Sequence, residues 1–417
     1  MSEGNERTRL FGERQKRLND VIALRVPDRV PVVYFSEFWH AAYGGRTIRD
    51  VMYDYDLASD LIIKAITDLQ PDCVGSPFAN SAIGPVLDLI GYQQLRWPGH
   101  GLGDDSCYQY IDTELMKPDE YDLYLEDPSY FWLSRYLPRV GDAFAGLAKL
   151  PQFSSLEYTD LLLGVSSFAD PEVVQSFTKL AAAGAESQRM LRRAGAHFGE
   201  IADSGFPSII AGMCPSPFDY FADFLRGSKG IMLDMFRKKD KLLAAMERAI
   251  PILTRSAVAQ GKRSSCNIVF IPLHWGLDGF MSLPQFKTFF WPQLRRVMMG
   301  MIENDVIPCV LWEGDCTSRL ETIADIPAGK TMYAFERTDI FLAKEILGDR
   351  VCLRGNVPAS LLTTGTPDDV TACCRKLIEI VGKNGGFILD GGNGIPDKAK
   401  TENVFAMMRS VHEFGRY

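Results

Sequence analysis

One segment of the chain, residues 306–339, constrains the fold most strongly. It contains two apolar runs, Val306–Leu311 and Thr331–Phe335, each followed closely by a glutamate, and a helix-like stretch joins them. A buried strand that ends in a polar loop and leads into a helix is the repeating unit of α/β sheets and barrels. In such barrels the chemistry lies at the carboxyl ends of the strands. The two glutamates, Glu313 and Glu336, are therefore predicted to face one mouth.

The same alternation recurs along the chain and predicts a parallel sheet. Further strands are predicted at Val30–Ser36, Asp72–Ser76, Ser208–Met213, Asn267–Leu273, Val351–Leu353 and Phe387–Leu389. The pattern alone leaves a closed barrel and an open doubly wound sheet as alternatives. No GxGxxG motif follows the first predicted strand, which weighs against a dinucleotide-binding fold.

Chain length bounds the domain organisation. The 417 residues fit one decorated α/β barrel or two domains. We predict a helical extension over residues 1–24 and a single (β/α)8 TIM barrel over residues 25–417. An irregular stretch around residues 84–130 is predicted to be an insertion on that barrel.

Composition excludes several classes of protein. The net charge of −8 argues against a general binder of nucleic acid or of anionic membranes. The chain contains no run of about 18 apolar residues, so no membrane span is predicted. The polar first residues do not read as a signal peptide, and nine cysteines without framework spacing predict a reducing, cytoplasmic setting.

Residues that follow the predicted strands are rich in groups that bind metals or move protons. Zinc accepts nitrogen and carboxylate oxygen, and a catalytic zinc site keeps one position open. His274, Glu313 and Glu336 are the predicted metal ligands. Paired carboxylates can also handle a proton, and Glu313, Asp315 and His40 are the predicted catalytic residues.

Each of these assignments has a structural alternative. His274 could cap or fill a polar site in the core, and His40 could be packing beside its aromatic neighbours. Glu313 could form a salt bridge with Arg319 on the following helix. Glu336 could pair with Arg337 or with a lysine nearby.

An aromatic cluster is the second signal for a site. Aromatic walls suit a flat apolar ligand, although the same rings could plug the top of the barrel. The predicted wall consists of Tyr34, Phe35, Phe38, Trp39 and Phe78. Asn356 and Asn393, which follow the last two predicted strands, complete the predicted substrate site.

Several longer stretches point to a family. They are RVPDRVPVVYF (25–35), YGGRTIRDVMYDYDLASDLIIKAITDLQPD (43–72), HWGLDGFMSLPQFKTFFWPQLRRV (274–297), GNVPASLLTTGTPDDV (355–370) and ENVFAMM (402–408). With these stretches the chain resembles the uroporphyrinogen decarboxylase superfamily, and within it the corrinoid- and cobalamin-dependent methyltransferases, the ether-cleaving members most. The resemblance covers most of the chain after residue 20. It implies a (β/α)8 barrel, zinc acting as a Lewis acid, and cobalamin presented by a partner protein.

The chain departs from the patterns of that branch at its metal site. Thiol methylases of the branch carry His-x-Cys at one strand end and a cysteine near the last strand. Here Trp312 and Gly314 stand at the first pair of places and Asn393 at the last. Val357 stands where the ether-cleaving members carry their histidine. A zinc site of this chain is therefore expected to use oxygen and nitrogen ligands only.

The resemblance implies a function. The expected reaction moves a methyl group from a methylated small molecule, such as a methoxylated aromatic, to the cobalt of a corrinoid protein, with a metal assisting the leaving oxygen. One alternative is a tetrapyrrole decarboxylase, which would need arginines near the first strand, where this chain has Glu37–His40. Another is a barrel that binds corrinoid or metal without turnover. The expected partners are a corrinoid protein and the methylated substrate, and a homodimer stays open.

Overall fold

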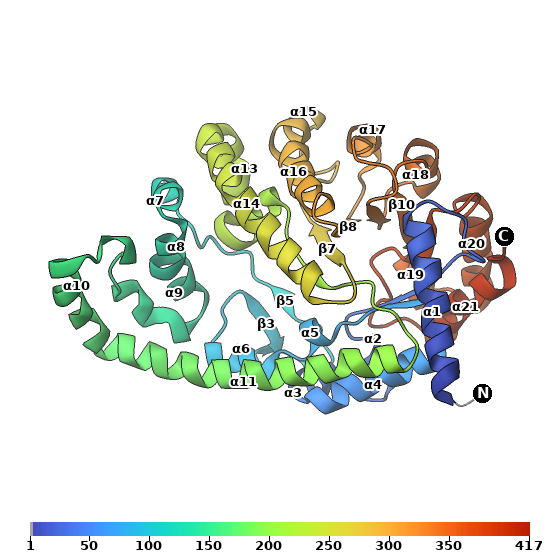
Figure 1. Ribbon diagram of the computed structural model, residues 1–417, viewed down its shortest axis with the longest axis horizontal. Coiled ribbons are helices and arrows are strands. Elements are labelled where there is room, and N and C mark those ends of the chain that lie inside the picture. The colour runs from blue at the N-terminus through green and yellow to red at the C-terminus, as the bar shows by residue number, and fades with distance from the viewer. Residues whose placement is uncertain (1–2) are drawn as a thin grey trace.

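Residues 3–417 are described by a computed structural model, shown in Figure 1. Among these residues, eight parallel strands form the walls of one barrel. They are β1 (Val33–Phe35), β2 (Cys73–Gly75), β6 (Gly212–Met213), β7 (Ile268–Leu273), β8 (Ile307–Trp312), β9 (Met332–Phe335), β10 (Cys352–Val357) and β11 (Phe387–Gly391). Each lies within or overlaps a strand predicted from the sequence.

Hydrogen-bonded pairing closes these strands into a ring. Strands β6 to β11 form one continuous parallel sheet, and β1 pairs with β2. A parallel bridge between Val74 and Ser208 joins β2 to the segment before β6, and a bridge between Val32 and Leu389 joins the approach to β1 with β11. The closed (β/α)8 barrel is therefore confirmed, and the open doubly wound sheet is wrong.

Helices surround the strands and follow them in sequence (Figure 1). The outer helices are α4 (Tyr55–Leu69), α11 (Pro171–Asp203), α14 (Lys239–Arg263), α16 (Trp291–Ile302), α17 (Leu320–Ile323), α18 (Ile340–Leu347), α20 (Pro367–Ile380) and α21 (Thr401–Phe414). Helix α1 (Glu3–Ile22) packs Leu18, Val21 and Ile22 into the cluster inside the barrel. Within residues 3–417, no helix has both the length and the apolar character needed to cross a bilayer.

The period of two along each strand decides what enters the barrel. On β8, Cys309 and Leu311 belong to the cluster inside the barrel, whereas Val310 and Trp312 belong to the core between strands and helices. Successive strand residues point to opposite faces, so Glu313 continues the inward series just above the barrel. The same alternation along the other strands places four further residues on the inward side, at the ends of their strands. These residues are Glu37, His274, Glu336 and Asn356.

A buried ion pair closes the interior of the barrel below its mouth. Arg354 on β10 and Asp390 on β11 are at most 2% exposed, and their Nη2 and Oδ2 atoms are 2.7 Å apart. The guanidinium also lies 4.6 Å from the ring centre of Phe35 on β1. The pair thus connects the last two strands across the top of the apolar interior.

Two glycines join the last strand to the first. A Cβ at Gly391 would lie 2.0 Å from the carbonyl oxygen of Gly394, and a Cβ at Gly394 would lie 2.6 Å from that of Phe35. Just beyond, the N–H of Ile395 donates to the Phe35 carbonyl at 2.7 Å. The glycine-rich loop after β11 therefore packs directly against β1.

The connection from β2 to β6 is much longer than the others and extends away from the barrel (Figure 1). It begins with two short helices, continues through a small three-stranded sheet and then forms an arm of short helices that leads to α11. Its elements are α5 (Phe78–Ser81), α6 (Gly84–Ile90), β3 (Leu95–Pro98), β4 (Gly101–Leu102), β5 (Gln109–Tyr110), α7 (Tyr121–Glu126), α8 (Pro128–Phe131), α9 (Leu137–Val140) and α10 (Tyr158–Gly164).

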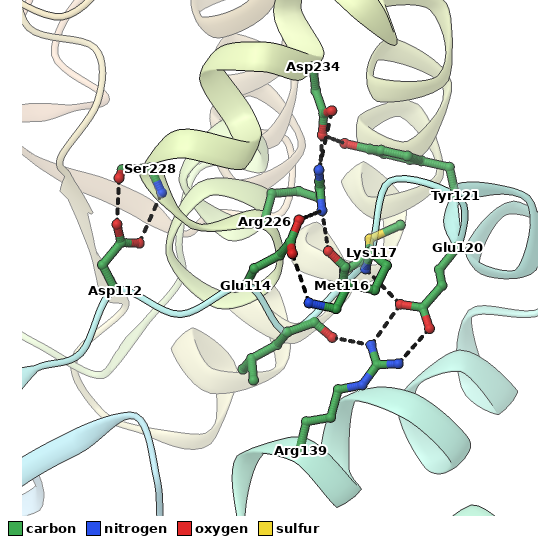
Figure 2. Close-up of polar contacts among 11 residues, drawn as sticks. Asp112, Glu114, Met116, Lys117, Glu120, Tyr121, Arg139, Arg226, Ser228 and Asp234 are labelled. Atoms are coloured by element: carbon green, nitrogen blue, oxygen red, sulfur yellow. Dashed lines mark hydrogen bonds and ion pairs between the residues drawn. The ribbon is translucent and has the colours of Figure 1, made fainter.

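A charged network ties this connection to the helix after β6 (Figure 2). Arg226 precedes α13 (Gly227–Arg237) and donates from Nε to Asp234 at 2.5 Å and from Nη1 to Glu114 at 2.7 Å. Tyr121 on α7 donates its hydroxyl to the same Asp234 at 2.7 Å. Arg226 and Asp234 are each 3% exposed at the side chain, so the network is a buried anchor of the connection.

Tyr121→Phe removes one hydrogen bond to a buried carboxylate and leaves the packing of the ring unchanged. We expect the free energy of unfolding to fall by about 2 kcal/mol, because hydrogen bonds to charged groups contribute more than neutral ones. Urea denaturation followed by circular dichroism measures the change. Tyr158→Phe is the control, since Tyr158 is 84% exposed. Equal free energies of unfolding for the two variants would contradict a stabilising role of the Tyr121 hydroxyl in the network.

Candidate active site at the barrel mouth

The predicted residues of the carboxyl ends meet at the mouth. Nε2 of His274 lies 3.6 Å from Oε1 of Glu313, so the ends of β7 and β8 bring these two side chains together. Glu336, at the end of β9, accepts the backbone N–H of Gly314 at 2.7 Å. All three predicted metal ligands therefore lie around the same loop.

The structural alternatives for the two glutamates do not hold. Arg319 pairs with Asp278, whose Oδ1 is 3.0 Å from Nε, and not with Glu313. In the part of the chain that the structure describes, Glu336 forms no ion pair with Arg337. Within residues 3–417, neither glutamate is therefore neutralised by an arginine.

The side chains as placed do not form a zinc site. Within residues 3–417, no three His, Cys, Asp or Glu side chains are arranged to hold a metal ion. Oε2 of Glu336 accepts the N–H of Gly314, whereas Nδ1 of His274 is held by Asp223 and Nε2 faces Glu313.

Two aspartates that the sequence analysis missed hold the histidine. Asp223 lies 2.7 Å from Nδ1 of His274 and accepts Nε1–H of Trp275 at 2.6 Å. Asp219, one turn earlier, accepts the backbone N–H of Trp275 at 3.2 Å and the hydroxyl of Ser216 at 2.9 Å. A histidine that binds a carboxylate through Nδ1 directs Nε2 the other way, here toward Glu313.

The helix that carries these aspartates explains why they were missed. It starts at α12 (Pro217–Phe221), directly after β6, and its aromatic residues produce a clear apolar face. The spacing of four residues between Asp219 and Asp223 puts both on one side of the helix. Two acids four residues apart, directly after a strand, were the sequence signal that could have identified them as site residues.

Carboxylates keep the histidine charged. Burial lowers the pKa of His274, but the hydrogen bond and charge of Asp223, followed by the charges of Asp219 and Glu313, raise it to about 9. Burial and the charge of Asp223 raise the pKa of Asp219 to about 8. Burial likewise raises the pKa of Glu313, with the charge of Glu336 adding to it. The mouth thus holds one imidazolium among several acids.

The insertion supplies one wall of this mouth. Tyr108 donates its hydroxyl to Oε1 of Glu37 at 3.1 Å, and Sγ of Cys107 lies 3.5 Å from Oε2 of the same carboxylate. Burial raises the pKa of Glu37. Tyr110, on β5, donates to the backbone carbonyl of Asp223. These contacts could not be predicted from local sequence patterns, because they join the irregular insertion to residues far away in the chain.

His40 and Asp315, which were predicted as catalytic residues together with Glu313, are not positioned to donate a proton at the mouth. His40 is fully buried, neither ring nitrogen has a partner, and burial lowers its pKa to about 3. It is therefore a neutral core residue, and its catalytic assignment is wrong. Asp315 accepts the N–H and hydroxyl of Thr317 at 2.9 and 2.6 Å, so its carboxylate stabilises the turn after β8.

The predicted aromatic wall is wrong for four of its five members. Tyr34, Phe38, Trp39 and Phe78 are at most 1% exposed and belong to the core between strands and helices. Tyr34 stands on the outward side of β1, and the indole of Trp39 donates to a backbone carbonyl at 3.0 Å. Phe35 points into the barrel, where it packs under the guanidinium of Arg354.

An open cavity of about 720 Å³ lies over the ends of β9, β10 and β11. Glu336, Asn356 and Asn393 line it, and it continues outward between α18 and α20. Asn356 donates its amide to the carbonyl of Thr338 at 3.1 Å, which fixes that side chain. The two predicted substrate-binding asparagines thus share one cavity with Glu336, one of the predicted metal ligands.

These features define a (β/α)8 barrel protein with an acidic, histidine-containing mouth. The family model described as uroporphyrinogen decarboxylase (URO-D) matches residues 188–414, more than half of the chain. The chain belongs to the uroporphyrinogen decarboxylase family.

Individual relatives match shorter stretches. The chain is 26% identical over 214 residues to a uroporphyrinogen decarboxylase of Cellvibrio japonicus, covering 49% of this chain and 58% of that protein. It is 33% identical over 137 residues to one of Chlorobium phaeovibrioides, covering 32% and 38%. The chain thus aligns with about half of the length of such relatives or less.

A solved structure extends the similarity to nearly the whole chain. A methyltransferase from Methanosarcina mazei superposes with a TM-score of 0.60 at 17% identity, covering 96% of this chain and 98% of that one. At this identity the match supports the fold alone.

Proposed function

We propose that this protein is a methyltransferase that moves a methyl group from a methylated small molecule to the cobalt of a corrinoid carried by a partner protein. The observation that carries the proposal is the His274 imidazolium, held by Asp223 and directed toward Glu313 at the open mouth. A methyl–oxygen bond breaks only when the leaving oxygen is stabilised, and a positioned acid can do this. The reduced cobalt of the partner supplies the nucleophile.

The residues of the mouth have separate tasks in this reaction. The methyl group leaves its oxygen, the bonding electron pair stays on that oxygen, and Nε2 of His274 donates the proton that neutralises it. Asp223 holds the ring through Nδ1, and the charges of Asp223, Asp219 and Glu313 raise the pKa of the imidazole so that it stays charged. His274 takes the role that the sequence analysis gave to His40 and Asp315.

A tetrapyrrole decarboxylase is the second candidate, because the relatives named above carry that name. A substrate with many carboxylates needs arginines to pair them. Among the arginines near the strand ends, Arg354 is paired with Asp390 and Arg319 with Asp278, which leaves Arg337 beside the cavity. The mouth itself presents mainly acids, which favours the methyltransferase.

Methyl transfer can be tested directly. Purified protein is mixed with reduced cobalamin and a panel of methoxylated aromatics, and the Co(I) absorbance is followed as methylcobalamin forms. We expect turnover of at least one methoxylated donor and no decarboxylation of uroporphyrinogen. Decarboxylation without methyl transfer would contradict the proposal, and inactivity in both assays would favour a binding barrel without turnover.

Zinc, the corrinoid-protein partner and a homodimer stay predictions. Zinc bound by His274, Glu313 and Glu336 would use Oε1 of Glu336, because Oε2 accepts the N–H of Gly314. Metal analysis of the purified protein, before and after dialysis against zinc buffer, tests this point. Protein that stays metal-free would rule out the zinc prediction and leave proton donation by His274 in place.

A further inference from the structure

The cavity over β9, β10 and β11 has a basic outer wall. Arg337 follows β9, and Lys376 lies on α20, and both side chains line the cavity. In the part of the chain that the structure describes, neither side chain forms an ion pair or donates a hydrogen bond. Nζ of Lys376 lies 4.6 Å from the ring centre of Phe341, a cation–π contact that holds the ammonium at the wall.

This basic wall contrasts with the rest of the mouth. The acids there are Glu37, Asp219, Asp223, Glu313 and Glu336, and the chain as a whole carries a net charge of −8. Arg337 and Lys376 are exposed and pair with none of these acids, so both cations are accessible to a ligand in the cavity. Ser360 and Asn393 add a hydroxyl and an amide to the same lining.

The position in the fold also favours an anion. Strands β10 and β11 are the seventh and eighth of the barrel, and loops after these two strands frequently bind phosphate groups in (β/α)8 barrels. The cavity volume of about 720 Å³ is in the range of sites for small molecules. Gly392, Asn393 and Gly394 of the loop after β11 line the cavity at this edge.

We propose that Arg337 and Lys376 form a binding site for a carboxylate or phosphate group of a ligand in this cavity, and that the carboxylate belongs to the methyl donor. The assignment to the donor rests on the proposed function. The acidic half of the mouth repels an anionic end and the basic wall attracts it. A methylated carboxylic acid would therefore bind with its acid group outward and its methyl group toward His274 and Glu313.

Binding to the full-length protein tests the site without any turnover. The probes are para-methoxybenzoate, its neutral amide para-methoxybenzamide, and inorganic phosphate, each measured by isothermal titration calorimetry. We expect the benzoate to bind at least about tenfold more tightly than the amide, and Arg337→Gln or Lys376→Gln to remove most of that difference. Phosphate should compete with the benzoate, and added salt should weaken both.

Matched controls separate the site from general charge. Lys383→Gln and Arg350→Gln each remove one exposed cation outside the cavity, near α20 and before β10, and should leave the affinity for benzoate unchanged. Thermal melting shows whether each variant stays folded. Equal affinity for benzoate and amide, no detectable binding of either, or equal effects of the control substitutions would overturn the site.

Two further results show whether the bound anionic group belongs to the methyl donor or to the acceptor. Cobinamide lacks the phosphate-bearing nucleotide of cobalamin, so displacement of phosphate by cobalamin and not by cobinamide would place the anion on the acceptor and overturn the assignment to the donor. Benzoate that binds through Arg337, in a protein that demethylates no donor of the panel, would support the anion site and contradict the proposed function. The two proposals can therefore fail separately.

Discussion

His274→Gln should lower kcat for methyl transfer by about 100-fold or more, because a positioned general acid contributes on that scale. The KM for the donor should change much less, since the anion site and the asparagines lie on the other side of the mouth. Steady-state formation of methylcobalamin measures both constants. His100→Gln is the control, because His100 is a half-exposed residue of the insertion paired with Asp88. Equal kcat in both variants would exclude proton donation by His274.

The pH profile distinguishes an acid from a merely structural residue. The pKa of His274 is about 9, above its ordinary 6.5, so kcat should fall as the pH rises through about 9. In Asp223→Asn the largest favourable contact of the ring is lost, and this fall should move to lower pH. Asp315→Asn removes an acid that only stabilises a turn and should leave the profile unchanged.

The same pKa fixes the sign of a stability effect. A folded-state pKa above the unfolded value means that the histidine stabilises the fold fully below pH 6.5 and loses this contribution as the pH rises through about 9. Thermal melting across that window should show the loss in the wild type and a smaller one in Asp223→Asn. An NMR titration of the imidazole reports the two pKa values without any activity assay.

Arg354→Met should lower the free energy of unfolding by about 3–5 kcal/mol, because it leaves the carboxylate of Asp390 unpaired inside the barrel. Urea denaturation measures the change. The double variant Arg354→Met/Asp390→Asn should recover part of the loss, since it removes the unpaired charge as well. Arg350→Met, an exposed site, should change stability by less than about 0.5 kcal/mol. A loss as small as this in Arg354→Met would show that Asp390 finds another partner or a proton.

The strands were predictable because each is a short apolar run followed by polar residues. The strand after Ser208 is the weakest case: only Gly212–Met213 pair regularly, since the preceding residues contact β2 through a single bridge. The alternation of inward and outward side chains along each strand was a further signal, and the prediction did not use it. Counting by two from the apolar interior selects Glu37, His274, Glu313 and Glu336 and excludes Tyr34.

The remaining site residues depend on contacts that no local pattern reports. Tyr108 reaches Glu37 across 71 positions of the chain, and His274 reaches Asp223 across 51. Phe38 and Trp39 follow β1, as the prediction required, but the chain turns there into α2 (Trp39–Tyr43), which packs against α4. Standing after a strand is therefore not sufficient to place a side chain in the mouth.

The seam between β1 and the loop after β11 has a consequence for synthesis of the chain. β1 emerges from the ribosome early, whereas its second neighbour, β11, follows about 350 residues later. At roughly 5–20 residues per second, one edge of β1 waits on the order of 20–70 s for its partner. An unpaired strand edge is a site for wrong pairing, and β1 has only three residues. Its short length limits what a nascent neighbour could pair with during that interval.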